Sequence, residues 1–221
     1  CAVLLRDFHL YPDHFEQGLR VFPDDPLLLT FAGSLHEGLA STRVQEFLKS
    51  AVLPAGVTLK VGSPRTELER AEPLLRHALK IDSGAAEARV RLGRVLSLQA
   101  RYADALGELR RIDTAAPQIL QYYAALFTGD AAEALGRRDE ARAAYERATE
   151  LYPRAQAPRV ALSHLAKSSG DTARAIGALS PVLSATSEPL PEDDPFWSYY
   201  TAPGRDADAL LAQAYRALAS W

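Results

Sequence analysis

The side chains that could carry out chemistry in this sequence lack the spacing that such chemistry needs. His36-Glu37 begins a zinc-binding H-E-x-x-H pattern, but Ala40 stands where the second histidine belongs. Ser163-His164 lacks the G-x-S-x-G turn that exposes a nucleophilic serine. The acidic run at 192–194 lacks the glycine and the spaced oxygens of a calcium loop, so we expect a solvated turn there. We therefore predict no enzyme, no catalytic residue, no metal site and no cofactor.

The helices that would position any site are indicated by a ladder of alanines. Four alanines lie 34, 36 and 34 residues apart, and a large residue follows each of them four positions later. Positions i and i+4 share one face of a helix, so each pair offers a small and then a large side chain to a neighbouring helix. The alanines are Ala71, Ala105, Ala141 and Ala175, and the large residues are Leu75, Leu109, Tyr145 and Leu179.

Each alanine helix follows another segment with helical character. Gly93, Gly129 and Ser163 lie 12 residues before their alanines and offer the small surface that closely packed helices need. Turn signals separate the two segments at 100–102, 136–139 and 170–171, and Gly33 takes the small position in an earlier unit. Pro117 and Pro153 each fall 12 residues after an alanine and are expected to end the second helix.

This pattern resembles the tetratricopeptide repeat family, whose helix-turn-helix unit has about 34 residues, and we expect a bacterial member of that family. The resemblance covers most of the chain and implies an all-α fold, a right-handed superhelical solenoid of antiparallel helix pairs with a C-terminal capping helix. We expect one array over 1–221. Its parts are a partial repeat (1–24), a repeat with an insertion at 40–65 (25–83), repeats at 86–117, 121–153 and 156–187, and an aromatic and acidic loop with the capping helix (188–221).

Two segments interrupt the regular pattern. In the insertion, residues 40–52 are expected to extend the preceding helix, and Ser63-Pro64 to begin the next one. The segment "SEPLPEDDPFWSYYTAPG" (187–204) has two interpretations. Its aromatic residues could lie beneath a capping helix at 205–218, or they could lie across the concave surface and occupy it. We favour the cap, because every solenoid must cover its terminal apolar face.

The composition limits partners and location. The formal charge of −3 mixes both signs, and no aromatic and basic interleaving indicates nucleic acid. The single cysteine excludes a disulfide framework, and no apolar stretch is long enough to insert into a membrane. The chain starts without methionine in what looks like the middle of a helix, so we expect a fragment or a processed chain. The bacterial cytoplasm, or the periplasm if an export signal lies upstream, are both open, as is the oligomeric state.

The resemblance implies that a protein or peptide partner lies along the first helices of the units. Some family members clamp a carboxylate there with lysine and asparagine. In this sequence Val90 and Arg94 stand at those places, while Asp130 and Glu133 would repel a carboxylate, so we expect no such clamp. Two functions stay open: a scaffold or adaptor that binds a peptide or helix in the groove, or a structural segment of a larger protein whose groove is filled by its own C-terminal strip. Besides Glu37, the groove positions are Glu87, Val90, Arg94, Ser97, Tyr123, Leu126, Asp130, Glu133, Val160, His164 and Lys167.

Overall fold

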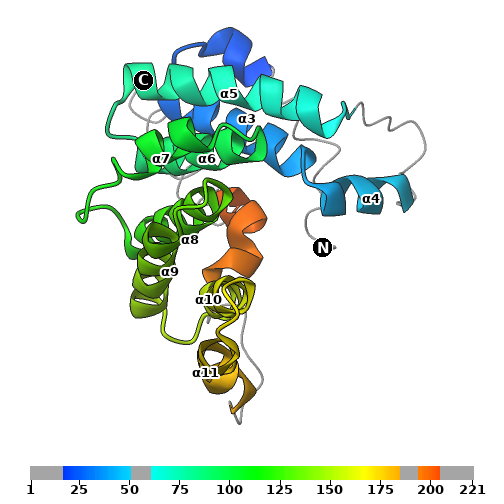
Figure 1. The fold of residues 1–221 in the computed structure, drawn as a ribbon. Helices are drawn as coiled ribbons and strands as arrows, with labels where there is room; N and C mark the ends of the chain where they lie inside the picture. The colour runs from blue at the N-terminus through cyan, green and yellow to red at the C-terminus, as the bar shows by residue number, and fades with distance from the viewer. Residues whose placement is uncertain (1–16, 51–60, 185–193, 205–221) are drawn as a thin grey trace.

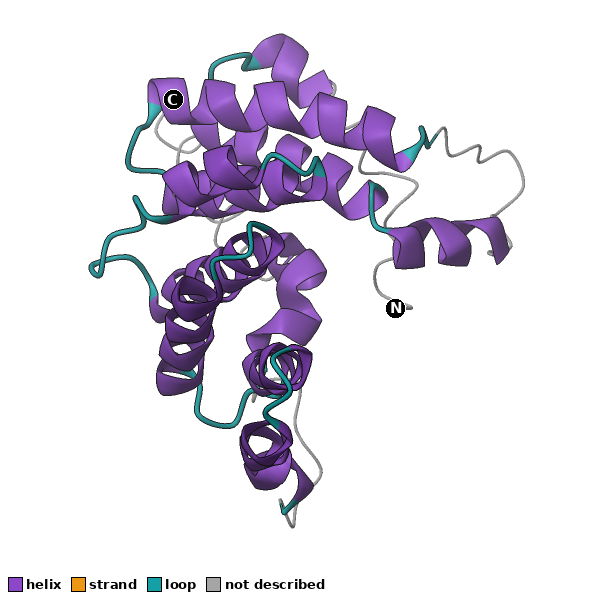
Figure 2. Cartoon of the chain, viewed as in Figure 1, coloured by secondary structure: helices purple, strands orange, loops and turns teal. Residues whose placement is uncertain are grey.

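The described part of the chain is built from helices packed in sequential pairs. A computed structural model describes residues 17–50, 61–184 and 194–204, and all regular structure within these ranges is helical (Figures 1 and 2). The all-α prediction is thereby confirmed. The division of the chain into the repeats given above stays a prediction.

Four helix pairs follow one another along the chain: α3 with α5, α6 with α7, α8 with α9, and α10 with α11. The first helices α3, α6 and α8 also contact one another in order, and the 3-10 helix η2 lies beside them on the inner side of the bend (Figure 1). The helix bounds are α3 Pro26–Leu39, α4 Thr42–Ser50, α5 Pro64–Ile81, α6 Ala86–Leu98, α7 Tyr102–Leu109, α8 Gln118–Ala134, α9 Arg138–Leu151, α10 Ala157–Ser168, α11 Thr172–Leu183 and η2 Pro195–Gly204.

The turn inside each of the last three pairs repeats one hydrogen-bonding pattern. Ala100, Gly136 and Gly170 all have positive φ, at 60°, 72° and 78°. At the first turn, the amide of Ala100 donates to the Ser97 carbonyl, and that of Arg101 donates to the Leu96 carbonyl. These two bonds satisfy carbonyls that the end of α6 would leave unpaired. The predicted turn signals therefore end the first helix of each pair as expected.

Close approach of the paired helices depends on the small residues of the first helix. A Cβ on Gly33 would lie 2.7 Å from Leu75 Cγ, and one on Gly93 would lie 2.5 Å from Leu109 Cγ. A Cβ on Gly129 would overlap the ring of Tyr145. The predicted small-to-large contacts are thus present in three successive pairs.

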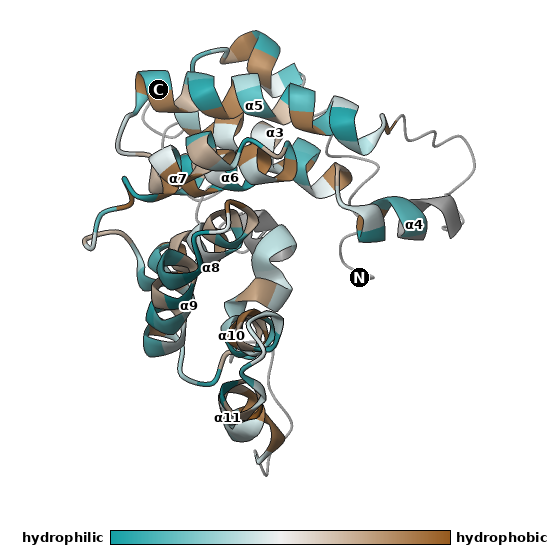
Figure 3. Cartoon of the chain, in the orientation of Figure 1, coloured by the Kyte–Doolittle hydropathy of each residue, from teal (hydrophilic) through white to brown (hydrophobic). Residues whose placement is uncertain are grey.

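The hydropathy of the outer helices follows the same ladder. The buried residues of α9 are Ala141, Tyr145 and Ala148, and the rest of the helix is largely hydrophilic (Figure 3). In α5, Ala71, Leu75 and Ala78 are buried at the same relative positions. No helix in the described ranges is long and apolar enough to cross a bilayer.

Two local expectations are wrong. The helix before the insertion does not continue, because α3 ends at Leu39 and α4 begins as a separate helix at Thr42. Pro117 does not end α7, which stops at Leu109, but stands at the N-cap position of α8. Proline suits that position because its missing N–H would have no helical partner there.

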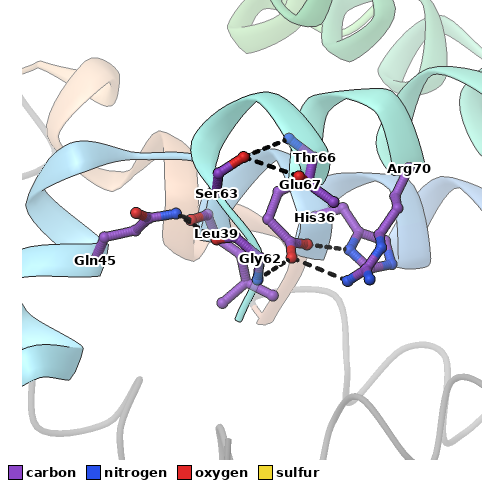
Figure 4. Close-up of polar contacts among 8 residues, drawn as sticks. All are labelled: His36, Leu39, Gln45, Gly62, Ser63, Thr66, Glu67 and Arg70. Atoms are coloured by element: carbon purple, nitrogen blue, oxygen red, sulfur yellow. Dashed lines mark hydrogen bonds and ion pairs between the residues drawn. The ribbon is translucent and has the colours of Figure 1, made fainter. Parts of the chain in front are cut away.

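A buried carboxylate fastens the end of the insertion to its neighbours. Glu67 of α5 is fully buried and accepts hydrogen bonds from the Gly62 amide at 2.6 Å and from Arg70 at 3.0 Å, and it contacts His36 Nδ1 at 2.6 Å (Figure 4). Gln45 of α4 donates to the Gly62 carbonyl at 3.1 Å. As expected, Ser63 caps α5 and Pro64 is its first residue. These contacts hold the starts of α4 and α5 against α3.

Candidate functional site on the inner face

The aromatic strip, residues 194–200, lies against the first helices of the array. Its first anchor is Asp194, which is only 2% exposed, so the expectation of a solvated turn is wrong at this residue, whose carboxylate finds donors within the protein. Asp194 Oδ2 accepts hydrogen bonds from the amides of Gln156 at 3.0 Å and Ala157 at 2.7 Å, at the start of α10. Oδ1 accepts from the buried Tyr122 hydroxyl at 2.6 Å and from the Phe196 amide at 3.0 Å. The carboxylate thus caps α10, whose N-cap residue supplies no side-chain cap of its own.

The second anchor is Tyr199, which is 1% exposed. Its hydroxyl donates to Glu37 Oε1 at 2.7 Å, and its carbonyl accepts from Arg91 Nη2 at 3.3 Å. Between the two anchors, the Tyr123 hydroxyl donates to the carbonyl of Pro195 at 2.9 Å. The strip is therefore held by side chains from α3, α6 and α8 as well as by the start of α10.

Aromatic packing surrounds the second anchor. The Tyr199 ring meets Phe127 at 5.0 Å between centroids and Tyr123 at 4.9 Å, both edge to face. Such pairs are a favoured aromatic geometry. The Arg91 guanidinium lies over the same ring at 4.6 Å from its centroid. Trp197, in contrast, is 57% exposed and contributes little to the contact with the array.

A buried ion pair sets the electrostatics beneath Tyr199. Arg91 donates to Glu37 Oε2 at 3.0 Å and to Glu87 Oε1 at 2.6 Å, and Glu37 is completely buried. Burial raises the pKa of the Glu37 carboxyl, against the opposing attraction of Arg91. Burial and the adjacent Glu37 raise the pKa of the Tyr199 phenol well above its ordinary value, so the phenol keeps the proton that it donates.

Four of the predicted groove residues belong to a second polar network. Arg94 donates to Asp130 at 2.9 Å, and the Tyr145 hydroxyl shares its one proton between Asp130 at 3.1 Å and Glu133 at 2.9 Å. His164 Nδ1 lies 3.1 Å from Glu133 Oε1. Burial raises the pKa of Asp130, although Arg94 opposes that shift. The sequence interpretation treated Tyr145 only as a packing residue and missed its two hydrogen bonds.

The remaining predicted groove residues divide between the core and the surface. Val90 and Leu126 lie in the hydrophobic core, and Tyr123 is buried with its hydroxyl on the strip. Ser97 is buried, and its hydroxyl has no hydrogen-bond partner within the described residues. Val160 and Lys167 of α10 are exposed. Whether any of these residues contacts another protein stays a prediction.

The strip takes the placement that we did not favour. Its aromatic side chains pack on α8 and α3, because Asp194 satisfies the start of α10 and Tyr199 fits among the rings of α8. The predicted capping helix over 205–218 lies outside the described residues. In the sequence, an acid directly before Pro195-Phe196 was the one available signal for this docking, since a carboxylate can cap a helix from outside it.

Comparison with known proteins agrees with this architecture. The family model described as "Tetratricopeptide repeat-like domain" matches residues 60–168. These residues form a tetratricopeptide repeat-like domain. The predicted family is thereby confirmed.

Similarity to a solved structure extends beyond residues 60–168. The crystal structure of PilW, described as a widely conserved type IV pilus biogenesis factor, matches with a TM-score of 0.62. The match covers 94% of this chain and 84% of that chain at 17% sequence identity, which supports a shared fold. None of the curated proteins matches the sequence.

Proposed function

We propose that this chain is a non-enzymatic scaffold for protein–protein interaction, and that its inner face binds a short segment of a partner protein. Tetratricopeptide domains generally mediate such interactions. The supporting observation is that the inner face holds residues 194–200, a segment outside the helix pairs, through groups from four helices.

The bonds to the strip are of a kind that a foreign peptide can also make. Tyr123 and Arg91 donate to main-chain carbonyls, which every polypeptide carries. Main-chain bonds supply affinity in peptide recognition, and side-chain pockets supply selectivity. A partner segment could therefore replace the strip without any change in the donors of the array.

A second candidate function is a structural segment of a larger protein, with a groove that its own strip fills permanently. The burial of Asp194 and Tyr199 favours this candidate, because both anchors would have to leave their sites before a partner could enter.

Affinity capture from the native lysate distinguishes the two candidates. The full chain is used as bait, and bound proteins are then challenged with a synthetic peptide of residues 191–204. If the chain is a scaffold that binds its partners at the inner face, this peptide should displace them, whereas a peptide of the same residues in scrambled order should displace none. Tyr123→Ala/Arg94→Glu should also recover fewer partners, with circular dichroism showing that it remains helical. Recovery of the same partners by the variant, unaffected by the peptide, would reject the inner face as the binding site.

A further inference from the structure

We propose that the inner face selects its ligand by two side chains five positions apart, a carboxylate and then a tyrosine, and that residues 194–200 are a competitor in cis for a partner segment of this chemistry. The inference rests on the proposed function and adds to it the class of partner and the means of regulation. The partner is a protein segment that carries an acid and, five positions after it, a tyrosine.

The first site accepts a carboxylate and disfavours its amide. Three donors from the array converge on the two oxygens of Asp194: the amides of Gln156 and Ala157, and the hydroxyl of Tyr122. An asparagine would turn its NH₂ group toward donors on one side or the other. The amides also lie at the positive end of the α10 dipole, which favours a negative charge.

The second site accepts a tyrosine and disfavours phenylalanine. The ring fits edge to face against Phe127 and Tyr123, and the hydroxyl donates to the buried Glu37. Phenylalanine would fill the same space but leave Glu37 without one of its donors, and an unpaired buried acceptor is costly. Hydrogen-bonding sites of this kind reject a ligand that lacks the hydroxyl more strongly than apolar pockets reject a change in size.

The residues between the two anchors differ in how far their binding depends on the side chain. Pro195 contributes its main-chain carbonyl to Tyr123, which does not depend on the side chain. Trp197 is mostly exposed, so its side chain can vary. Phe196 packs partly buried against the core and adds an apolar contact.

Regulation follows from the position of the competitor. The strip belongs to the same chain as its binding site, so its effective concentration at that site is high. A free segment displaces it only when that segment is abundant or binds more tightly. A partner therefore binds well only when it carries better anchors than 194–200 or when the strip is weakened.

Fluorescence anisotropy with a labelled peptide of residues 191–204, PEDDPFWSYYTAPG, tests this selection on the purified full chain. The wild-type chain should bind weakly, and Asp194→Ala/Tyr199→Ala, whose strip has lost both anchors, should bind at least tenfold more tightly. Peptides with Asn in place of the Asp194 equivalent, or Phe in place of the Tyr199 equivalent, should bind the variant at least tenfold more weakly. The matched control peptide, with Ala in place of Trp197, should bind within twofold of the parent.

Several results would overturn the proposal. Equal binding of all four peptides would reject the two-anchor selection, and so would no binding to a variant that circular dichroism shows to be folded. If that variant does not fold, Asp194→Asn/Tyr199→Phe, which keeps the size of both side chains, takes its place with the same expectations. A wild-type dimer that the free peptide dissociates would make the ligand a second copy of this chain instead of a partner. Peptide binding without captured partners would reject the proposed function alone.

Discussion

The carboxylate of Asp194 should contribute more to stability than an ordinary helix cap. Asp194→Ala removes the cap of α10, which is worth about 0.5–2 kcal/mol. It also leaves the buried Tyr122 hydroxyl without its acceptor, which adds about 1–3 kcal/mol. The expected loss in the free energy of unfolding is about 2–4 kcal/mol, which for a chain of this size lowers Tm by roughly 5–15 °C. Thermal and urea unfolding followed by circular dichroism measure both quantities.

Asp171→Ala is the matched control for this variant. Asp171 caps α11 by accepting from the Arg174 amide at 2.9 Å, but it serves no buried hydroxyl, so its removal should cost only about 1 kcal/mol. Adding Tyr122→Phe to Asp194→Ala removes the unpaired hydroxyl and should recover part of the loss. Equal costs for the two aspartates, together with no recovery in the double variant, would refute the assignment of Asp194 as a buried anchor.

Three further predictions concern the array itself. Gly129→Ala should be about 1–3 kcal/mol less stable than Gly107→Ala in urea unfolding. Both variants gain helix propensity, but the methyl group at 129 overlaps a tyrosine ring, whereas the one at 107 meets no atom within 4 Å. Equal stabilities would argue against close packing of α8 on α9. Because both positions have positive φ, Ala100→Gly should increase the free energy of unfolding and Gly136→Ala should decrease it, each by up to about 1–2 kcal/mol. Thermal unfolding measures both, and Tm shifts in the same direction would contradict this. Burial raises the folded-state pKa of Glu37 above its ordinary 4.5, so the unfolded chain loses this proton first as pH rises. Wild type should therefore lose stability relative to Glu37→Gln as pH increases above 4.5, and a relative gain in pH-dependent unfolding would show that the pKa is lowered instead.

The repeat architecture was predictable because its determinants are local and periodic. Ala141 and Tyr145 are buried in α9, at the i and i+4 positions that the pattern identified. The turn at Gly136 has the positive φ that its residue type suggested. A short period in the sequence thus translates directly into one buried face and one type of turn.

The occupied inner face was harder to predict because its contacts join distant parts of the chain. Asp194 lies 72 residues from Tyr122, and Tyr199 lies 162 residues from Glu37. The repeat positions of Val90 and Leu126 identified the correct helices, but periodicity alone could not show that these side chains are in the core. A contact that occurs once leaves no period in the sequence.

The chemistry of the buried groups indicates what kind of segment the inner face can accept. A buried ion pair such as Glu37 with Arg91 often stabilises a protein no more than apolar side chains of similar size would. Its effect here is to make occupancy conditional, because Glu37 needs the hydroxyl of Tyr199 and Arg91 needs the carbonyl of the same residue. An apolar segment of equal volume would bury both charges with these bonds unmade. The inner face therefore discriminates against generic hydrophobic segments, and the same groups that fix residues 194–200 in cis would impose that requirement on any partner.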